Sequence, residues 1–195
     1  MSRPTHDPTR VPTRQRILAA AAQAFGDDGF DRATLAAIGR RAGISRPSLL
    51  HHFESKEALY RQVVERAFRE LTTALLTPRG GDVAQRVVAL GLAFEEHLRE
   101  HPEHARIVVR ELISEGPGQA ILTEQVAPLL ARVTALVEVE LGPRIRADVP
   151  VRAALLQVAS SLVLQAATPV RDALWGAPPQ TEALIRSLLL PDEEN

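Results

Sequence analysis

Three histidines lie close together in the segment HLREHPEH, as His97, His101 and His104. Spacings of four and three residues place imidazoles on one face of a helix, an arrangement that can bind a transition-metal ion. Pro102 lies between the second and third histidine, however, and a proline inside a helix interrupts it. We therefore expect the third imidazole to leave the common face, and we predict no metal site. Histidines near the end of a helix also interact favourably with its dipole.

A second group of chemically active side chains lies in GISRPSLLHHFESKEALY, residues 43–60. Four of its side chains can bind an anion, namely Arg46, His51, His52 and Lys56. Adjacent residues on a helix diverge by about 100°, so the two histidines form neither a metal pair nor a catalytic pair. No acidic residue occurs between Asp31 and Glu54, a gap of 22 residues. A surface that meets phosphate groups requires such a gap.

The charge of the chain is divided unevenly along its length. Up to Phe53, eight arginines oppose four aspartates, a net charge of +4, whereas the whole chain of 195 residues carries −1. A basic N-terminal unit on an acidic body is typical of a protein whose one end meets an anionic polymer. The chain has no cysteine, which excludes disulfides and thiolate metal sites. It also has neither a nucleophile–base arrangement nor a phosphate-cradling glycine loop, so we expect no enzyme and no cofactor.

The elements that position these residues are predicted to be helices. Alanine, leucine, arginine and glutamate dominate, and no stretch alternates with period two. Proline and glycine divide the chain into about nine helices, so the predicted fold class is all-α. The first helix starts with Thr13 as its N-cap and ends near Gly26 to Gly29, and Pro128 is expected to kink a later one. The others are expected at about 34–41, 45–53, 55–78, 82–100, 103–115, 118–141, 150–168 and 180–190.

Residues 34–53, TLAAIGRRAGISRPSLLHHF, have the spacing of a helix-turn-helix. Gly43 separates two short helices, and the hydroxyls of Thr34 and Ser45 can cap their N-termini. Pro47 falls in the first turn of the second helix, where its missing N–H costs nothing. The second helix is expected to present a face with few acids, made of Arg46, Ser48, Leu50, His51 and His52.

At this point a family resemblance becomes clear. The strings RILAAAAQAFGDDGFDRATLAAIGRRAGIS and SLLHHFESKEALY, within residues 13–60, resemble the DNA-binding domain of the TetR family of transcriptional regulators. The rest of the chain resembles the family only as a helical domain of suitable length. The resemblance implies a flexible tail at 1–12, a DNA-binding domain at 13–60 and a helical ligand-binding and dimerisation domain at 61–195. The linking helix, at about 55–76, starts in the first domain and continues into the second.

The resemblance also implies a role for each matching residue. Thr34 would place its hydroxyl and the helix N-terminus on a phosphate, and Ser45 would cap the recognition helix. Arg46, Pro47 and Ser48 would enter the major groove, with Arg46 as the candidate for a bidentate contact to guanine. Leu50 stands where similar proteins usually carry tyrosine, and its side chain can contact a thymine methyl. Contacts to the DNA backbone are expected from Arg14, His52 and Lys56, and His51 is expected to lie at the same surface.

The C-terminal part of the chain carries two apolar stripes. The helix at 151–168 has apolar residues on two faces and therefore needs two partners, its own core and a surface outside it. By resemblance, it and the last helix pair with their copies in a second subunit. The expected dimer residues are Val151, Leu155, Val158, Leu162, Leu184 and Leu188. The resemblance also implies an apolar pocket for a small effector, with Phe94, Val109, Leu112, Leu130, Leu164 and Trp175 as candidate lining residues.

These expectations lead to one functional prediction and one alternative. The prediction is a homodimeric, ligand-responsive transcriptional regulator. Its expected role is that of a repressor, which a small molecule releases from a palindromic double-stranded DNA operator. The alternative is a small-molecule or metal-binding helical protein with a vestigial helix-turn-helix. The N-terminal MSRPTHDPTRVPT holds no apolar run of the secretory kind, so we expect a cytoplasmic protein. The uncharged segment 153–170 is interrupted by polar residues, and we expect a buried helix there rather than a membrane span.

Overall fold

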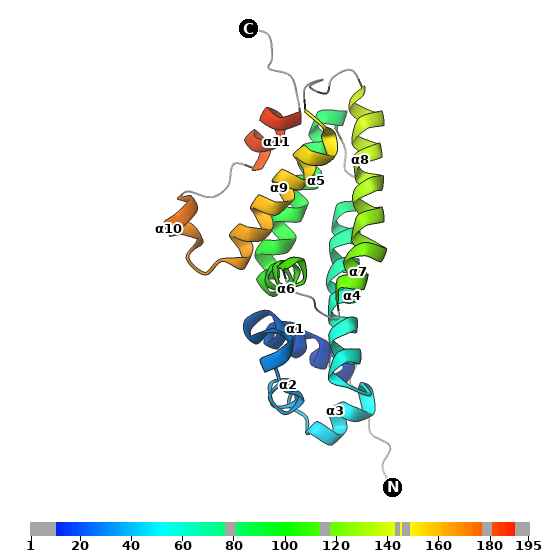
Figure 1. The fold of residues 1–195 in the computed structure, drawn as a ribbon, viewed down its shortest axis with the longest axis vertical. Coiled ribbons are helices and arrows are strands. Elements are labelled where there is room, and N and C mark those ends of the chain that lie inside the picture. The colour runs from blue at the N-terminus through cyan, green and yellow to red at the C-terminus, as the bar shows by residue number, and fades with distance from the viewer. Residues whose placement is uncertain are drawn as a thin grey trace.

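The computed structural model describes residues 11–76, 81–113, 118–142, 145, 149–176 and 181–189. Within these ranges the regular secondary structure is helical, which confirms the all-α prediction. The molecule is elongated, with a small unit that we call the head at one end and a larger bundle that we call the body at the other (Figure 1). The head contains α1 (Thr13–Arg32), α2 (Leu35–Ala42), α3 (Arg46–His52) and the start of α4 (Lys56–Leu76).

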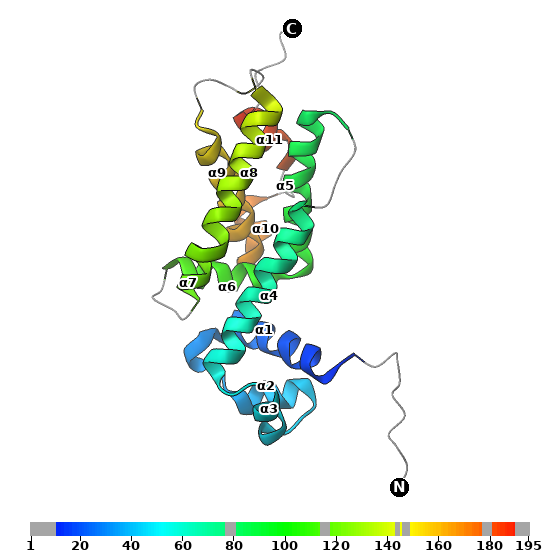
Figure 2. The same ribbon diagram turned by 90° about the vertical axis from the view of Figure 1, so that its right-hand side faces the viewer.

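The body contains the remainder of α4 and all later helices. Figure 2 shows α4 running out of the head and continuing beside α5 in the body. The later elements are α5 (Val83–Glu100), α6 (Pro102–Ile113), α7 (Gln119–Ile121), the π-helical segment η1 (Leu122–Val126), α8 (Ala127–Leu141), α9 (Val151–Ala167), α10 (Arg171–Trp175) and α11 (Thr181–Leu189). Helix α9 packs on α5, α6, α8 and α11 and so lies at the centre of the bundle.

Short polar side chains mark where several of these helices begin. The hydroxyl of Thr34 accepts a hydrogen bond from the N–H of Ala37 (3.2 Å), and that of Ser55 accepts one from Ala58 (3.0 Å). Asp82 forms a capping box with Gln85 at the start of α5. The prediction of Thr13 as an N-cap is wrong, because Thr13 is the first helical residue and the N-cap is Pro12, which has no side-chain hydrogen bond.

The head and the body each have a hydrophobic core of their own. The head core contains fully buried side chains from all four of its helices, including Ile17, Phe25, Ile38, Leu49 and Tyr60. The ring of Tyr60 packs edge-on against Phe25, with 4.8 Å between the ring centres. The body core contains side chains of α5, α6, α8, α9 and α11, such as Leu98, Val137, Leu162 and Leu189.

The head is joined to the body mainly through α1 and α6. A Cβ atom placed on Gly26 of α1 would lie 3.0 Å from the Cβ atom of Glu103 on α6, and 3.1 Å from its Cα atom, so the two helices touch at this glycine. Beside it, Arg106 donates a hydrogen bond to Asp27 (2.6 Å). The hydroxyl of Tyr60 on α4 donates to the carboxylate of Glu111, which is buried in α6. A close packing contact and the polar contacts of Arg106, Arg110 and Glu111 therefore fix the head on α6.

The segment predicted as one helix at 118–141 departs from a regular α-helix before Pro128. The N–H of Ala127 donates to the carbonyl of Leu122, five residues back, and residues 122–126 form a π-helical segment. Proline has no N–H, and its ring collides with the carbonyl four residues earlier in a regular helix. A π segment is a common way to accommodate such a disturbance. The disturbance expected at Pro128 therefore takes the form of a local widening of the helix in the preceding turn.

The C-terminal half differs from the sequence-based prediction in two respects, a short extra helix and the place of the long apolar helix. Helix α10 is too short for the sequence periodicity to predict. Among the described residues, the helix that is long and apolar enough to cross a membrane by length and composition is Gln119–Leu141, with a mean hydropathy of 1.4. Such a helix by itself is weak evidence for a membrane span. The segment singled out in the sequence contains α9, which is apolar but has only 17 residues.

Candidate nucleic-acid interface

The turn between α2 and α3 is tight and depends on Gly43. This residue has φ 70° and ψ 35°, a left-handed conformation that glycine adopts without strain. Its N–H donates to the carbonyl of Arg40 (3.1 Å), and the N–H of Ile44 donates to that of Gly39 (2.9 Å). These bonds satisfy carbonyls at the end of α2 and turn the chain sharply. The predicted helix-turn-helix is therefore formed, with α3 as its second helix.

Helix α3 starts with Ser45 as its N-cap. The hydroxyl of Ser45 accepts a hydrogen bond from the N–H of Ser48 (3.2 Å), and the two hydroxyls lie 2.9 Å apart. Pro47 lies in the first turn, as predicted. No acidic residue is present in the first turn of α2 or of α3. Both N-termini therefore offer the positive end of a helix dipole without a competing carboxylate.

Helix α3 is held by one side chain and exposes the others. Leu49 is fully buried, whereas Arg46, Pro47, Ser48, Leu50, His51 and His52 are all exposed. No described residue forms a hydrogen bond or an ion pair with Arg46, His51 or His52. Replacing a buried leucine by alanine typically costs about 2–5 kcal/mol, so Leu49 fixes the helix while the remaining side chains stay available. This is the geometry of a helix that enters a groove of another molecule.

Two of the predicted phosphate ligands have partners within the protein. The ammonium of Lys56 donates to the carbonyls of Asp31 (3.2 Å) and Ala33 (3.1 Å), and it lies 4.4 Å from the centre of the Phe30 ring. Lys56 therefore ties the start of α4 to the junction of α1 and α2.

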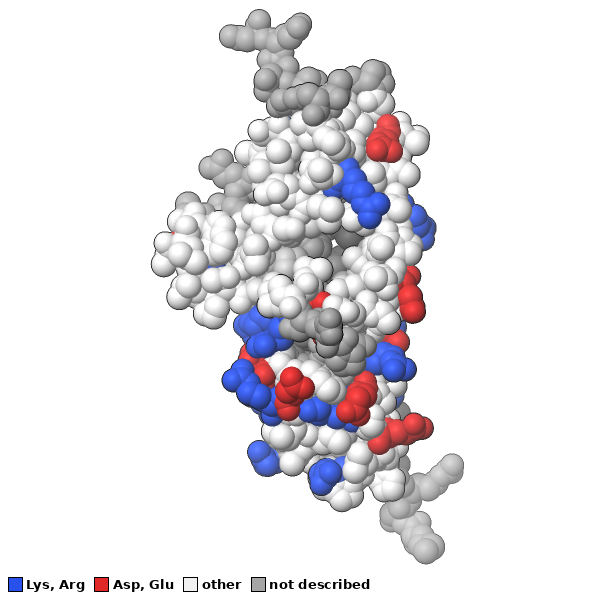
Figure 3. Space-filling view, in the orientation of Figure 1, with Lys and Arg blue, Asp and Glu red and all other residues white. Residues whose placement is uncertain are grey.

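Arg14 is similarly engaged. It donates a hydrogen bond to Gln62 of α4, and its guanidinium lies 5.0 Å from the centre of the Phe53 ring. The sequence analysis did not single out Arg40 and Arg41, which are exposed at the C-terminal end of α2. Arg41 forms an ion pair with Asp27 (3.7 Å). Figure 3 shows basic side chains at the tip of the head, below a belt of both signs at the level of the head–body joint.

The six candidate pocket residues are spread over exposed, half-buried and core positions of the body. Leu112, Leu164 and Trp175 are 65%, 47% and 41% exposed, whereas Phe94 and Val109 pack against the body core and Leu130 is half-buried. A cavity of about 470 Å³ lies instead where the ends of α5 and α9 meet α10, and none of the six lines it. Its lining includes Glu95, Arg99, Gln165, Arg171 and Asp172. Whether the six residues meet a ligand elsewhere stays a prediction.

The predicted dimer residues lie on the inner side of their helices. Val151, Val158 and Leu162 are at most 7% exposed and belong to the core of their own protomer, and Leu155, Leu184 and Leu188 are half-buried against it. Three of the six are thus occupied within one chain. The exposed side of α9 carries a different stripe, made of Arg152, Ala153, Leu156, Gln157, Ser160 and Leu164.

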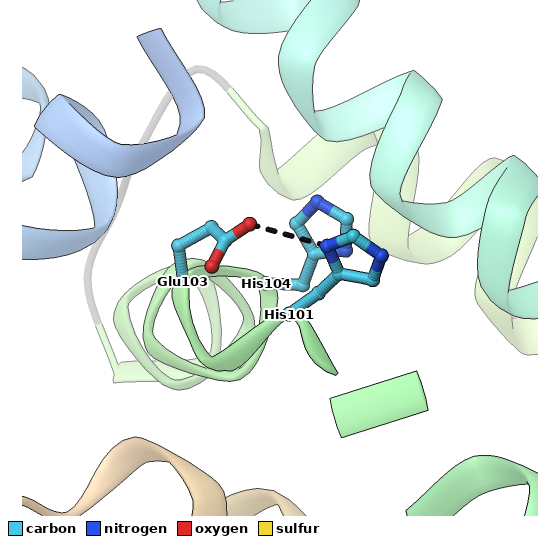
Figure 4. Close-up of side chains that lie close together, drawn as sticks. All are labelled: His101, Glu103 and His104. Carbon is cyan, nitrogen blue, oxygen red and sulfur yellow. Dashed lines mark hydrogen bonds and ion pairs between the residues drawn. The ribbon is translucent and has the colours of Figure 1, made fainter. Parts of the chain in front are cut away.

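The three histidines come together, contrary to the expectation that Pro102 separates them. The ring centres of His97, His101 and His104 lie 4.9–5.3 Å from one another. His97 Nε2 and His104 Nδ1 are 3.1 Å apart, and His101 Nδ1 lies 3.4 Å from Glu103 Oε1 (Figure 4). Burial lowers the pKa of His97, and it lowers that of His104 to about 4.

The head matches a known family of proteins. The family model for bacterial regulatory proteins of the tetR family matches residues 17–63. An uncharacterised HTH-type transcriptional regulator of Mycobacterium tuberculosis (strain ATCC 25618 / H37Rv) is 32% identical over 129 residues, which cover 62% of this chain and 66% of the relative. The match therefore spans slightly less than two thirds of that relative's length. The HTH-type transcriptional regulator UidR of Escherichia coli (strain K12) is 47% identical over 53 residues, 27% of each chain.

The likeness to solved structures extends over nearly the whole chain. A putative tetR family transcription regulator from Shewanella sp. PV-4 has a TM-score of 0.68 at 22% identity, and the match covers 93% of this chain and 100% of the other. A linker mutant of HlyIIR has a TM-score of 0.71 at 17% identity, with 94% and 97% covered. These structures share the fold of head and body.

The segment that the family model matches contains the elements that form the exposed interface. It runs from α1 through the helix-turn-helix to the first part of α4. The motif strings noted in the sequence, the turn at Gly43, the exposed α3 and the shared fold all agree with it. The N-terminal domain of the chain, which carries the helix-turn-helix, belongs to the tetR family of bacterial regulatory proteins.

Proposed function

We propose that this protein is a ligand-responsive transcriptional regulator that acts as a repressor and binds a palindromic operator as a homodimer. The observation that carries the proposal is α3 itself, a capped helix anchored by Leu49 with every other side chain exposed. It lies in a segment of 22 residues without an acid. In a dimer, two such helices would enter successive major grooves about 34–36 Å apart.

The proposed DNA contacts divide into base readers and backbone ligands. Arg46 has no intramolecular partner among the described residues and is proposed to contact guanine. Pro47, Ser48 and Leu50 lie beside it on α3 and are proposed to face the same groove. Thr34 and the N-terminus of α2 are proposed to bind a phosphate. His51 and His52 extend the surface. Arg14 and Lys56 are proposed to act mainly by positioning the head, because both have partners within it.

The proposed dimer surface is the exposed stripe of α9 together with the adjacent side of α11. Leu156 and Leu164 are 45% and 47% exposed in one protomer, and small or uncharged polar residues lie between them. A stripe of this kind gains stability when a second copy covers it. Charge placed at Leu162 would unfold the protomer rather than separate two protomers, because that side chain is only 3% exposed.

The proposed effector site is the cavity at the ends of α5 and α9. Its volume of about 470 Å³ falls within the usual range for small-ligand sites, about 300–1,000 Å³. Arginine and carboxylate side chains line it beside apolar ones, which suits an effector with polar groups. The cavity includes Pro102 at the start of α6, and α6 carries the head. Effector binding would then weaken the affinity for the operator, and operator binding would weaken the affinity for the effector by the same factor.

The test is a selection of bound duplexes from a random DNA pool by the purified full chain at about 0.15 M salt. The expected product is an inverted repeat with half-site centres about 10–10.5 base pairs apart. Arg132→Ala, an exposed arginine on α8, should select the same repeat and serves as the matched control for loss of one positive charge. A folded protein that enriches no sequence would contradict the proposal and favour a ligand-binding protein with a vestigial head.

A further inference from the structure

The corner between α5 and α6 brings together donor atoms that the proposed DNA-binding function does not use. His101 is the single residue between the two helices, and its N–H donates to the carbonyl of His97 (2.9 Å). Pro102 then starts α6 in a new direction, and its fixed φ suits the first position of a helix. The sharp turn brings His104, in the first turn of α6, over the last turn of α5. The turn at Pro102 therefore brings His97, His101 and His104 close together.

The donor set at this corner consists of imidazole nitrogens and carboxylate oxygens. One ligand atom from each of His101, Glu103 and His104 can be chosen so that all three atoms lie within 4.8 Å of one another. His97 adds a fourth donor, 3.1 Å from His104. Two nitrogens that bind one tetrahedral ion at 2.0–2.1 Å lie roughly 3.3 Å apart. The observed separation is therefore close to that of two ligands of one ion.

The surroundings of the cluster also suit an ion. His97 and His104 are buried, whereas the side chain of His101 is 41% exposed and leaves a way in from solvent. Glu70 of α4 lies within electrostatic reach of His101 and His104, so a second carboxylate is close to the cluster. Imidazole with one carboxylate is a common ligand set for Zn²⁺, Ni²⁺ and related divalent ions.

We propose that His97, His101, His104 and Glu103 bind one divalent transition-metal ion of the Zn²⁺ or Ni²⁺ class at the α5–α6 corner. Small rotations of the imidazoles would direct their lone pairs to one point. His97 and His104 form a hydrogen bond with each other, and an ion bound between them would take the place of the shared proton. This inference does not depend on DNA binding.

The test uses the full-length protein without a polyhistidine tag, freed of metal by a chelator and then titrated with ZnCl₂ in competition with a chromogenic chelator. We expect one tight equivalent per chain. His101→Ala removes the most exposed ligand, so it should fold normally, and it should bind Zn²⁺ at least about 10-fold more weakly, since even partners that only orient ligands contribute this much. The double variant His51→Ala/His52→Ala is the matched control and should keep the wild-type affinity.

A second measurement separates a built site from histidines that bind metal loosely. Co²⁺ in place of Zn²⁺ should give the intense visible absorption of a tetrahedral site in the wild type and in the control, and lose it in His101→Ala. Circular dichroism of each metal-free variant confirms that it is folded. The proposal is overturned if the wild type binds Zn²⁺ no more tightly than His101→Ala, or if the control loses as much affinity.

Discussion

Replacing Lys56 separates two roles that a basic residue near DNA can have. Its ammonium donates to two backbone carbonyls, of Asp31 and Ala33, and lies over the ring of Phe30. An ammonium directs three protons to different sides, whereas a guanidinium is a planar fork. Lys56→Arg therefore keeps the charge and loses this geometry, while Lys56→Met keeps most of the apolar stem and loses both.

The size of the effect follows from these contacts. A hydrogen bond to a charged group contributes about 1.5–3 kcal/mol, but the bond to Asp31 is exposed and the bond to Ala33 is only partly buried. A cation over an aromatic ring adds about 0.5–1 kcal/mol at an exposed site. We expect Lys56→Met to lower the free energy of unfolding by about 2 kcal/mol, and Lys56→Arg to lower it by a smaller amount.

Urea unfolding and salt-dependent operator binding measure the two roles separately. With a urea slope of about 2 kcal/mol per molar, Lys56→Met should unfold at about 1 M less urea. A residue that binds phosphate should reduce the salt slope of binding by about 1 when it is removed, and we expect no such change. Arg132→Met on α8 is the control for charge. An unchanged unfolding midpoint together with a reduced salt slope in Lys56→Met would show that Lys56 binds phosphate, and would refute our reading of its contacts.

Three further substitutions test the interface, the dimer and the joint. Arg46→Ala should relax discrimination at one base pair of each half-site by about 1–3 kcal/mol, measured by competition with singly changed operators; an equal loss on every sequence would contradict a base contact. Leu156→Asp should yield monomers in sedimentation, whereas Leu136→Asp, also at 45% exposure but on α8, should remain dimeric, and the reverse result would move the interface to α8. Tyr60→Phe removes the donor to buried Glu111 and should cost about 1–3 kcal/mol of stability, so an unfolding midpoint equal to that of the wild type would argue against this bond.

The head could be predicted from the sequence because its boundaries are set by local chemistry. The hydroxyls of Thr34 and Ser45 cap α2 and α3 as expected, and Gly43 takes the left-handed conformation that ends α2. Each of these signals acts within a few residues, so it can be read without knowledge of tertiary contacts. The exposure of Arg46 and its neighbours was expected from the sequence, and Leu49 is the residue of α3 that is buried.

The body was less predictable because its signals depend on packing over long distances. Helix α9 has apolar residues on both sides, and periodicity alone does not say which side meets the protomer's own core; Leu162 is on the inner side and Leu156 on the outer. At the histidine corner, Pro102 predicted a break correctly but not the direction of the chain after it. The contacts of Lys56 join residues 23 and 25 positions apart, and no local pattern shows them.

Helix α4 is long enough to amplify a small tilt into a larger displacement of the head. Its 21 residues extend over about 32 Å at 1.5 Å per residue. A tilt of only about 5° at the body end would carry the opposite end through roughly 3 Å, close to the rise of one base pair, about 3.4 Å. Two reading helices that swing apart by that amount lose their register with a fixed operator. In the proposed dimer, a small movement at the body end of α4 would therefore be enough to weaken binding to a fixed operator.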